Sequence, residues 1–367
     1  MEGHGFLKLV NGIPYGEYNN VLRVLKEYNI EPKAITKVRS VYKIETHDGT
    51  KCLKRIKHGK GKPKRTYYIT QYLMDRGFDK VAPFIKTSND RLYVKHKGFY
   101  YYMTEWINGR ECNIDDFEEL KRCTKLLAEF HIAASGKEGK NYFKLHSNLK
   151  NWPSIFIDNC NQLLEFKALI EQKRIKSDFD NKYNNYIDYF YRQGLIAVDL
   201  LNKSDYYLIS ARAKESREVC HDSFYYQNLI IDESSNNIYL IDLDSTVCDI
   251  RMHDLGKFIR RIMFKTPYAW DFNKASEIID AYNSVVHITK EELEVLLAII
   301  IFPHKFCKLG KKRYIKKKLW SEEKYNKKIG RQIKYIDKQR EFTREFIEFY
   351  GIDIDLNLYF DDVKEAK

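Results

Sequence analysis

One short block constrains this chain most, because it is strand-like in a sequence with helical periodicity from about residue 115 onward. The block reads VCHDSFYYQNLIIDESSNNIYLIDLDS and holds two apolar runs, 228–231 and 238–241, around the polar turn 233–237. Two such runs joined by a turn predict a β-hairpin. The polar residues at its two ends are His221, Asp222, Asn228, Asp242 and Asp244.

These polar residues match what phosphoryl transfer from a magnesium nucleotide requires. Magnesium prefers hard oxygen ligands, commonly one Asn and one or two Asp. The attacking hydroxyl also needs a carboxylate about five residues before the Asn. Asn228, Asp242 and Asp244 meet the first requirement, so the sequence predicts a metal and nucleotide site at this hairpin.

Length and composition indicate the number of domains and the class of protein. At roughly 150 residues per domain, 367 residues predict two domains or one two-lobed unit. Apolar residues at 44% and aromatic residues at 14% exclude a disordered chain. No apolar run is long enough for a membrane span and the first thirty residues lack a secretory signal, so we expect cytoplasmic synthesis. The seven cysteines form no C-x-x-C pair, which predicts buried thiols rather than a zinc site.

The order of elements predicts an α+β fold. A strand pair at 38–46 and 51–56 is followed by a helix at 66–76 and by strand runs at 84–87, 91–95 and 99–106. After residue 115 the periods are helical, with two helices expected within 155–213. We therefore predict a first domain at 1–107, with an antiparallel sheet and one helix. The second domain, 108–367, is predicted to be mostly helical and to carry the hairpin 220–246.

Two motifs in the hairpin block bring a resemblance to known proteins. The block resembles the H-x-D-x-x-x-x-N and I-D-x-D motifs of aminoglycoside phosphotransferase-like kinases, and Asp254-Leu255 stands where that family has an Asp-Leu pair. The further segments VYKIET, KCLKR, LMDRGF, FIKTSNDRLYV and YYMTEWINGRE are similar to those of the CotS family of spore coat proteins. The resemblance extends over roughly residues 20–345.

The resemblance implies a fold, a location and cofactors. The fold is the two-lobed protein-kinase-like fold, with a small β-rich N-lobe, a larger helical C-lobe and a nucleotide cleft whose hinge runs from Glu105 to Ile107. The location is the spore coat, with other coat proteins as partners. The cofactors would be ATP and Mg²⁺.

Site residues follow from matching positions to the family motifs. Lys54 matches the strand lysine that contacts the α- and β-phosphates. Asn228 and Asp242 match the magnesium ligands, Asp244 is the second acid, and His221 begins the catalytic loop. Plainer readings remain open beside these, since Lys54 lies in a basic run and His221 suits a structural, hydrogen-bonded histidine.

Three departures from the family pattern weigh against catalysis. The position five residues before Asn228 is Ser223, whose hydroxyl is a poor proton acceptor at neutral pH, while Asp222 stands one residue too early. No glutamate occurs between residues 46 and 104, and Gln71 stands about where the partner of Lys54 is expected, which predicts an unclamped lysine. The strand turn has only Gly49 in place of a glycine-rich loop.

Two functions remain open. The first is a coat-associated structural or interaction protein whose kinase-like fold is degenerate in catalysis. The second is an active ATP-dependent kinase for a small molecule or sugar, in which a one-residue shift of the loop makes Asp222 the base. Retention of three metal-type ligands favours the second function, whereas the three departures favour the first.

The net charge is concentrated in one segment. Residues 305–340 hold fifteen Lys or Arg against three acids, which accounts for +12 of the chain's +13. One reading is a solvated face whose lysine stems cover Tyr314, Leu319, Trp320 and Tyr335. The other is a surface for polyphosphate, an acidic glycan or an acidic coat protein. A nucleic-acid partner is not favoured, because the sequence shows no nucleic-acid-binding fold, and no membrane partner is expected.

Overall fold

The computed structural model describes residues 9–57, 59–136 and 145–354. The chain divides into two compact units. We call residues 1–113, 136–145 and 221–246 the sheet unit, and residues 114–135, 146–220 and 247–367 the helical unit. The predicted border at 107 thus falls at 113, and the hairpin groups with the sheet rather than with the helices.

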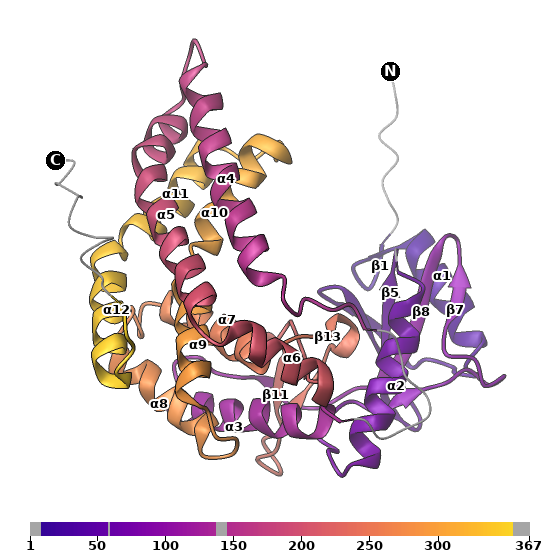
Figure 1. Cartoon of the computed structure of the whole chain (residues 1–367). Coiled ribbons are helices and arrows are strands. Elements are labelled where there is room, and N and C mark those ends of the chain that lie inside the picture. The colour runs from indigo at the N-terminus through magenta and orange to yellow at the C-terminus, as the bar shows by residue number, and fades with distance from the viewer. Residues whose placement is uncertain (1–8, 58, 137–144, 355–367) are drawn as a thin grey trace, which may run out of the picture. The chain divides into compact units, whose positions relative to one another are not determined.

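The main sheet of the sheet unit is antiparallel and has the strand order β3-β4-β5-β8-β6, of which Figure 1 labels β5 and β8. Its strands are β3 (Ala34–Val38), β4 (Val41–Thr46), β5 (Gly49–Ile56), β8 (Phe99–Glu105) and β6 (Phe84–Ile85), and β7 (Val94–His96) also pairs with β8. The run expected as one strand at 38–46 is broken by a tight turn, because Arg39 adopts a positive φ of 53° and lets Val38 pair with Val41.

Helix α1 (Tyr15–Lys26) covers one face of this sheet and was not predicted from the sequence. Its buried Val21, Val24 and Leu25 are spaced for one helical face. They pack with Tyr42 and Ile44, which alternate along β4 as half-buried strand residues do. The short pair β1 (Leu9–Val10) and β2 (Ile13–Pro14) precedes α1.

The predicted hairpin is confirmed as β11 (Leu229–Ile231) and β12 (Ile238–Leu240). Strand β11 also pairs with β9 (Arg110–Glu111), which gives a three-stranded sheet in the order β12-β11-β9. In addition, the Leu240 N–H donates to the Lys80 carbonyl at 2.8 Å. These backbone bonds attach the hairpin to the sheet unit.

Helix α2 (Gly61–Asp75) belongs to the same unit and begins five residues before the predicted start. Its first turn is Gly61-Lys62-Pro63-Lys64. Proline is tolerated there because the first backbone N–H groups of a helix have no partner within it. The earlier start places Lys62 on the helix, which matters for the site described below.

The helical unit consists of helices and one small strand pair, β10 (Val219–Cys220) with β13 (Val247–Cys248) (Figure 1). Its helices are α3 (Phe117–Ala134), α4 (Trp152–Glu171), α5 (Asp178–Lys203), α6 (Tyr206–Ser216), α7 (Arg251–Met263), α8 (Phe272–Asn283), α9 (Lys290–Ile301), α10 (His304–Gly310), a π-helical turn (Lys311–Ile315), α11 (Glu322–Ile333) and α12 (Ile336–Tyr350).

Local signals explain several of these helix boundaries. Ser177 and Asp180 form a capping box at the start of α5, and Thr289 with Glu292 does so for α9. Residues 155–213 contain three helices rather than the predicted two, because Ser204 leaves helical geometry with ψ 169° and α6 begins two residues later. Helix α9 is buried over its last seven residues and packs on α5 and α7, so it forms the centre of this unit.

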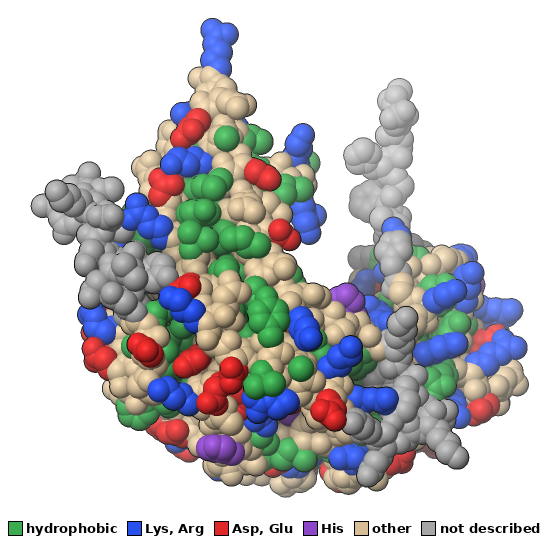
Figure 2. Space-filling model, in the orientation of Figure 1, with side chains coloured by type: hydrophobic (Ala, Val, Ile, Leu, Met, Phe, Trp, Pro, Cys, Tyr) green, Lys and Arg blue, Asp and Glu red, His purple; other side chains and the backbone are tan. Residues whose placement is uncertain are grey.

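Within the described ranges, none of the helices is long and apolar enough to cross a bilayer. All seven cysteines are free thiols. Five are buried, as predicted, and Cys52 and Cys248 are partly exposed. On the face that Figure 2 shows, apolar side chains gather over α4 and α5.

Candidate functional site

The sheet unit contains a pocket of about 350 Å³ between its main sheet, helix α2 and the hairpin. Its walls are largely apolar, and the apolar lining residues include Val38, Val41, Cys52, Ile230, Leu240 and Ile241. Burial raises the pKa of the Cys52 thiol to about 11, so this side chain is a neutral part of the wall at pH 7. An apolar slot with a polar end suits a flat heterocycle that carries a charged group.

Lys54 and Asp242 meet at the polar end of the pocket. Strand β5 places Lys54 opposite Val41 on one neighbouring strand and Tyr102 on the other. The Lys54 ammonium donates to Asp242 Oδ1 and lies 3.1 Å from Asp244 Oδ2. The prediction that Lys54 lacks a clamp is therefore wrong, because the two acids after β12 supply it.

The backbone after β12 explains how one lysine reaches both acids. Asp242 adopts a left-handed conformation with φ 70°, and a single 3₁₀ turn (Leu243–Ser245) follows it. Asp tolerates this conformation better than most residues with a side chain. The turn buries Asp244, which is 4% exposed, while Asp242 lines the pocket.

The charges of this cluster balance one another. Burial lowers the pKa of Lys54, whereas Tyr102, Asp242 and Asp244 raise it, and the balance lies above the ordinary value. For Asp244, burial raises the pKa, but Lys54 and Lys62 lower it by more. Both groups therefore stay charged at neutral pH.

Lys62 is the residue of this site that the sequence analysis missed. Its Nζ lies 3.3 Å from Asp244 Oδ2, so Asp244 is shared by two ammonium groups from β5 and α2. The sequence does not single out Lys62, because it is one of eight Lys or Arg between residues 51 and 65.

Helix α2 presents two threonines to the pocket. Thr66 and Thr70 are buried and line the pocket, one turn apart on α2. Gln71, the residue expected there, is not among the lining residues. The Thr70 hydroxyl has no hydrogen-bond partner among the described residues. A buried polar group of this kind favours a water or a polar ligand beside it.

Hydrogen bonds hold the loop that precedes the hairpin. The buried His221 donates from Nε2 to the Ile241 carbonyl at 3.0 Å and accepts the Ser223 N–H on Nδ1 at 3.2 Å. Asn228 Nδ2 donates to the Ser223 carbonyl at 2.9 Å. Asp222 has a positive φ of 59°, so the chain turns sharply between His221 and Ser223. His221 is thus a structural residue of this loop, in line with its plainer reading.

The hydrogen bond of Asn228 also determines what its other amide atom can do. Because Nδ2 donates to Ser223, Oδ1 is the atom that remains as a ligand. Asn228 lines the pocket together with Asp242. Their hard oxygen atoms, with those of Asp244, have the chemistry that Mg²⁺ prefers.

The segment after β8 lines the opposite end of the pocket with Glu105, Trp106 and Ile107. The Glu105 carboxylate accepts from Lys51 at 2.7 Å, and the Trp106 N–H donates to the Thr50 carbonyl at 3.1 Å. Among the described residues, the backbone N–H and C=O of Ile107 have no hydrogen-bond partner. One free donor and one free acceptor match the edge of a purine base.

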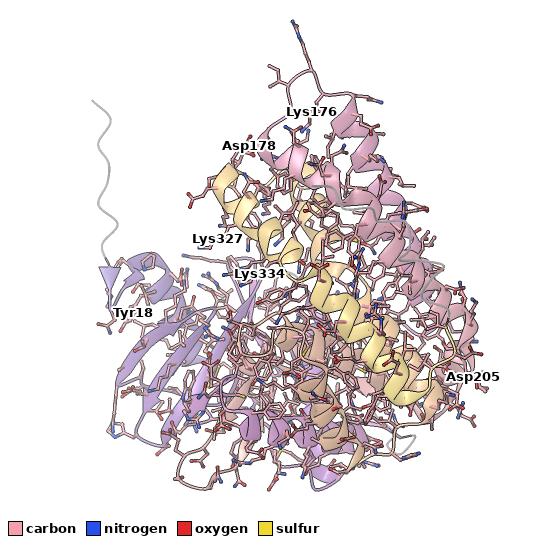
Figure 3. The ribbon with its side chains drawn as sticks, turned by 90° about the vertical axis from the view of Figure 1, so that its left-hand side faces the viewer. Tyr18, Lys176, Asp178, Asp205, Lys327 and Lys334 are labelled. Atoms are coloured by element: carbon pink, nitrogen blue, oxygen red, sulfur yellow. The ribbon has the colours of Figure 1, made fainter. Side chains whose placement is uncertain are left out.

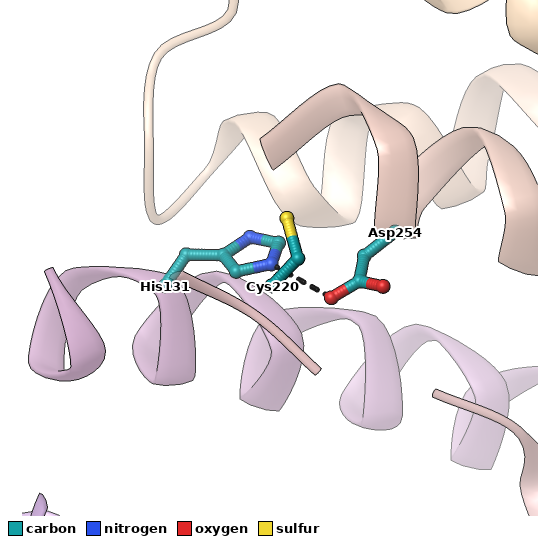
Figure 4. A group of neighbouring side chains, drawn as sticks. All are labelled: His131, Cys220 and Asp254. Atoms are coloured by element: carbon teal, nitrogen blue, oxygen red, sulfur yellow. Dashed lines mark hydrogen bonds and ion pairs between the residues drawn. The ribbon is translucent and has the colours of Figure 1, made fainter. Parts of the chain in front are cut away.

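The helical unit holds a second group of side chains, His131, Cys220 and Asp254 (Figure 4). His131 bonds to the Tyr282 hydroxyl through Nδ1 at 2.7 Å and to Asp254 Oδ2 through Nε2 at 3.3 Å. The Cys220 thiol donates to the Ile250 carbonyl at 3.2 Å. Since each side chain already has a protein partner, we interpret this group as a brace between α3, β10 and α7 rather than as a metal site.

Comparisons with known proteins agree with this geometry. The model of the family described as "Spore coat putative kinase YutH" matches residues 22–346. Spore coat protein S of Bacillus subtilis (strain 168) is 28% identical over 316 residues, which cover 85% of this chain and 88% of that protein.

Solved structures support the fold assignment. An aminoglycoside phosphotransferase from Alicyclobacillus acidocaldarius superposes with a TM-score of 0.78 at 20% identity, covering 90% of this chain and 96% of that one. An amicoumacin kinase in complex with AMP-PNP and Ca²⁺ superposes with a TM-score of 0.57 at 11% identity, covering 90% and 94%. At these identities the likeness concerns the fold alone, and it confirms the predicted aminoglycoside phosphotransferase-like class.

Proposed function

This chain belongs to the spore coat YutH family, as the resemblance predicted, and we propose that it is a coat protein that binds a magnesium nucleotide but transfers phosphate poorly. The observation that carries this proposal is the hydrogen bond from Asn228 Nδ2 to the Ser223 carbonyl. It supports a loop in which Ser223, and not Asp222, occupies the position of the base.

The proposed chemistry follows from the presence of Ser223 at the position of the base. A carboxylate five residues before the metal-binding Asn would accept the proton of the attacking hydroxyl. A serine hydroxyl cannot accept that proton usefully near neutral pH, and loss of a positioned base typically costs 10²–10⁴-fold in rate. Binding does not depend on the base, so the pocket can retain nucleotide affinity while transfer is slow.

The nucleotide would be held from both ends of the pocket. The Ile107 backbone would pair with the purine, and Lys54 would contact the phosphates. Asn228, Asp242 and Asp244 would hold Mg²⁺, which supplies charge neutralisation for the phosphates when it is bound. Lys62 already neutralises part of the charge on Asp244. We therefore propose that one divalent ion is sufficient for tight binding.

The role in the coat would be structural or through interaction with other coat proteins. The helical unit exposes several large apolar side chains that a partner protein could cover. They include Leu164 (40% exposed) and Leu169 (42%) of α4, and Tyr207 (47%) and Leu208 (53%) of α6.

A gain-of-function substitution tests the proposal. Ser223→Asp places a carboxylate at the proposed base position, and we expect ATP hydrolysis to rise by on the order of 100-fold, with ATP affinity changed by less than about threefold. Ser223→Asn is the matched control, since it has the same shape without a basic group. The proposal is wrong if the wild-type protein binds no nucleotide, or if Asp and Asn give the same rate.

The second candidate is the active small-molecule or sugar kinase, favoured by the retention of Asn228 and Asp242 in the pocket lining and of the buried Asp244 beside Lys54. It predicts efficient transfer by the wild-type protein and a loss on the order of 100-fold in Asp222→Asn. Screening ATP consumption against a panel of sugars and amino alcohols, with the wild type and Asp222→Asn side by side, separates the two candidates.

A further inference from the structure

The helical unit gathers basic residues from three elements into one cluster. We call it the basic cluster; its members are Lys257, Arg260, Arg261 and Lys265 from α7 and the residues after it, Lys305, Lys308, Lys312 and Lys316 from α10 to the end of the π-helical turn, and Lys328 and Arg331 from α11. Helix α11 continues this character, since Lys327 and Lys334 lie on one side of it, two turns apart (Figure 3).

The neighbouring positive charges of the basic cluster lower the pKa of several of its lysines. Burial, and then Arg260, Lys265, Arg261 and Arg331, lower the pKa of Lys305 to about 7. Burial followed by other basic groups also lowers the pKa of Lys308 and of Lys312. An aromatic neighbour compensates part of the charge of Lys305, whose Nζ lies 3.5 Å from the centre of the Phe264 ring.

Five lysines of the basic cluster have no acidic partner in the described part of the chain. Lys305, Lys308, Lys312, Lys316 and Lys328 form no ion pair there. Glu322 lies nearby, but it forms its ion pair with Arg313. Holding these five lysines close to other cations without an ion pair of their own lowers the stability of the fold, which is expected where an anion from outside supplies negative charge.

The geometry limits the kind of anion. The cluster extends over several elements, so a chain-like ligand fits it better than a single small anion. Its accessible cations are mainly lysines, which bind phosphate as point charges, while Arg260 is buried and donates to the Ile299 carbonyl. Arginine forks, which match both carboxylates and phosphates, are few here, so recognition depends on the density of negative charge along the ligand.

The aromatic residue at the cluster is not arranged to stack on a nucleic-acid base. Three ammonium groups lie over the Trp320 ring, those of Lys312 at 4.6 Å, Lys324 at 4.7 Å and Lys328 at 5.3 Å from its centre. A stacking platform needs an open aromatic face. The covered ring therefore favours recognition of charge along a chain over recognition of bases.

From this arrangement we propose that the basic cluster binds a linear polymer that carries a phosphate group in each repeat. Two sources supply that chemistry, an inorganic polyphosphate chain and a polymer of alcohol phosphodiesters. The proposal is independent of nucleotide binding in the sheet unit, because every residue it uses belongs to the helical unit.

Calorimetric titration of the full chain with linear sodium polyphosphate, and separately with poly(glycerol phosphate), tests the proposal. The variant Lys308→Gln, Lys312→Gln, Lys316→Gln, Lys328→Gln should bind at least about tenfold more weakly than the wild type. The matched control neutralises four exposed lysines elsewhere in the same unit, Lys176, Lys182, Lys214 and Lys290, and should bind within about twofold of the wild type.

Each outcome decides the question. Binding to either polymer with the expected variant pattern supports the proposal and identifies the source. Equal loss in both quadruple variants would mean that only net charge matters, and the proposed site would be wrong. Poly(glutamate) of equal charge binding as tightly as the phosphate polymers would assign the surface to acidic polypeptides instead. Tighter binding of single-stranded DNA than of the phosphate polymers would also contradict the proposal.

Proton uptake provides a second readout that unshifted surface lysines do not give. The pKa of Lys305 is lowered toward neutral pH and an anion beside it would raise that pKa, so binding near pH 7 should take up a fraction of a proton per chain. Titrations in two buffers of different ionisation enthalpy measure this number. Lys305→Met should remove most of the uptake. Binding by the wild type without uptake would show that the polymer does not reach Lys305.

Discussion

Two groups of lysines in this protein have opposite surroundings. In the sheet unit, Lys54 and Lys62 converge on Asp244, and Lys54 also contacts Asp242. In the helical unit, Lys305 and its neighbours are surrounded by other cations. The pKa of Lys54 is accordingly raised, whereas that of Lys305 is lowered to about 7.

This difference indicates in which region the negative charge near the lysines comes from the protein and in which region a ligand would supply it. The sheet-unit lysines have built-in counterions, so their geometry is set before a nucleotide arrives and binding exchanges one set of ionic contacts for another. Lys305, Lys308, Lys312, Lys316 and Lys328 of the helical unit form no ion pair within the described residues, and their charge is most favourable when a ligand brings negative charge. Local net charge alone does not distinguish the two cases.

The largest expected effect comes from removing the counterion of the sheet unit. Asp244→Asn leaves Lys62 without its acid and Lys54 with Asp242 alone, and should lower the free energy of unfolding by about 3 kcal/mol, as for a broken buried ion pair. Urea denaturation measures the change. Asp90→Asn is the control, because its ion pair with Lys86 is exposed and should contribute less than about 0.5 kcal/mol.

The same substitution should alter the dependence of stability on pH. Since the pKa of the Asp244 carboxyl is lowered in the folded protein, its contribution is complete above an ordinary pKa of about 4 and is lost as pH falls below that value. The wild-type protein should therefore lose stability more steeply than Asp244→Asn between pH 5 and about 3. Parallel curves would contradict the proposed role of this carboxylate.

The second effect has the opposite sign. Lys305→Met should stabilise the protein by on the order of 1 kcal/mol at pH 6, because it removes a partly buried cation that its neighbours repel. The folded-state pKa lies below the ordinary lysine value of about 10.4, so the penalty is complete below pH 7 and is relieved as pH rises. The gain in melting temperature should shrink at pH 9. A destabilised variant at pH 6 would show that Phe264 compensates the charge fully.

Nucleotide binding gives a smaller effect that sharpens the role of Lys62. If Lys62 replaces part of the metal charge at Asp244, Lys62→Met should weaken ATP binding about fivefold without Mg²⁺ and by less than about twofold with saturating Mg²⁺. Isothermal calorimetry with EDTA or Mg²⁺ measures both values. Lys64→Met, a neighbouring exposed lysine, should change neither. Equal weakening under both conditions would assign Lys62 to phosphate contact instead.

The smallest expected effect is that of salt. Raising NaCl from 0.05 to 1 M shortens the screening length to about 3 Å and should relieve repulsion in the basic cluster more than it weakens the partly buried pairs of the sheet unit. The melting temperature should rise by about 1–3 °C. The rise should be halved or less in the variant with Gln at residues 308, 312, 316 and 328. An equal rise in that variant would place the repulsion elsewhere.

The sequence alone determined the elements that depend on local pattern and the residues that belong to family motifs. The hairpin, the central strands and most helices follow from periodicity and turn residues, and the positions of Lys54, Asn228, Asp242 and Asp244 follow from motif spacing. The sequence alone also shows that the positive charge is concentrated in residues 305–340. These features are predictable because they involve residues close together in the chain.

Only the tertiary structure decided which charges meet. Lys54 and Asp242 are 188 residues apart, and the basic cluster combines α7 with α10 and α11, so no local pattern encodes either contact. The sequence suggested that Lys54 lacked a partner, because the helix after its strand contains no glutamate. It also suggested that lysine stems cover Leu319, which is fully exposed. Side-chain contacts between distant segments depend on how whole elements pack, and ionic energies change sign with that packing.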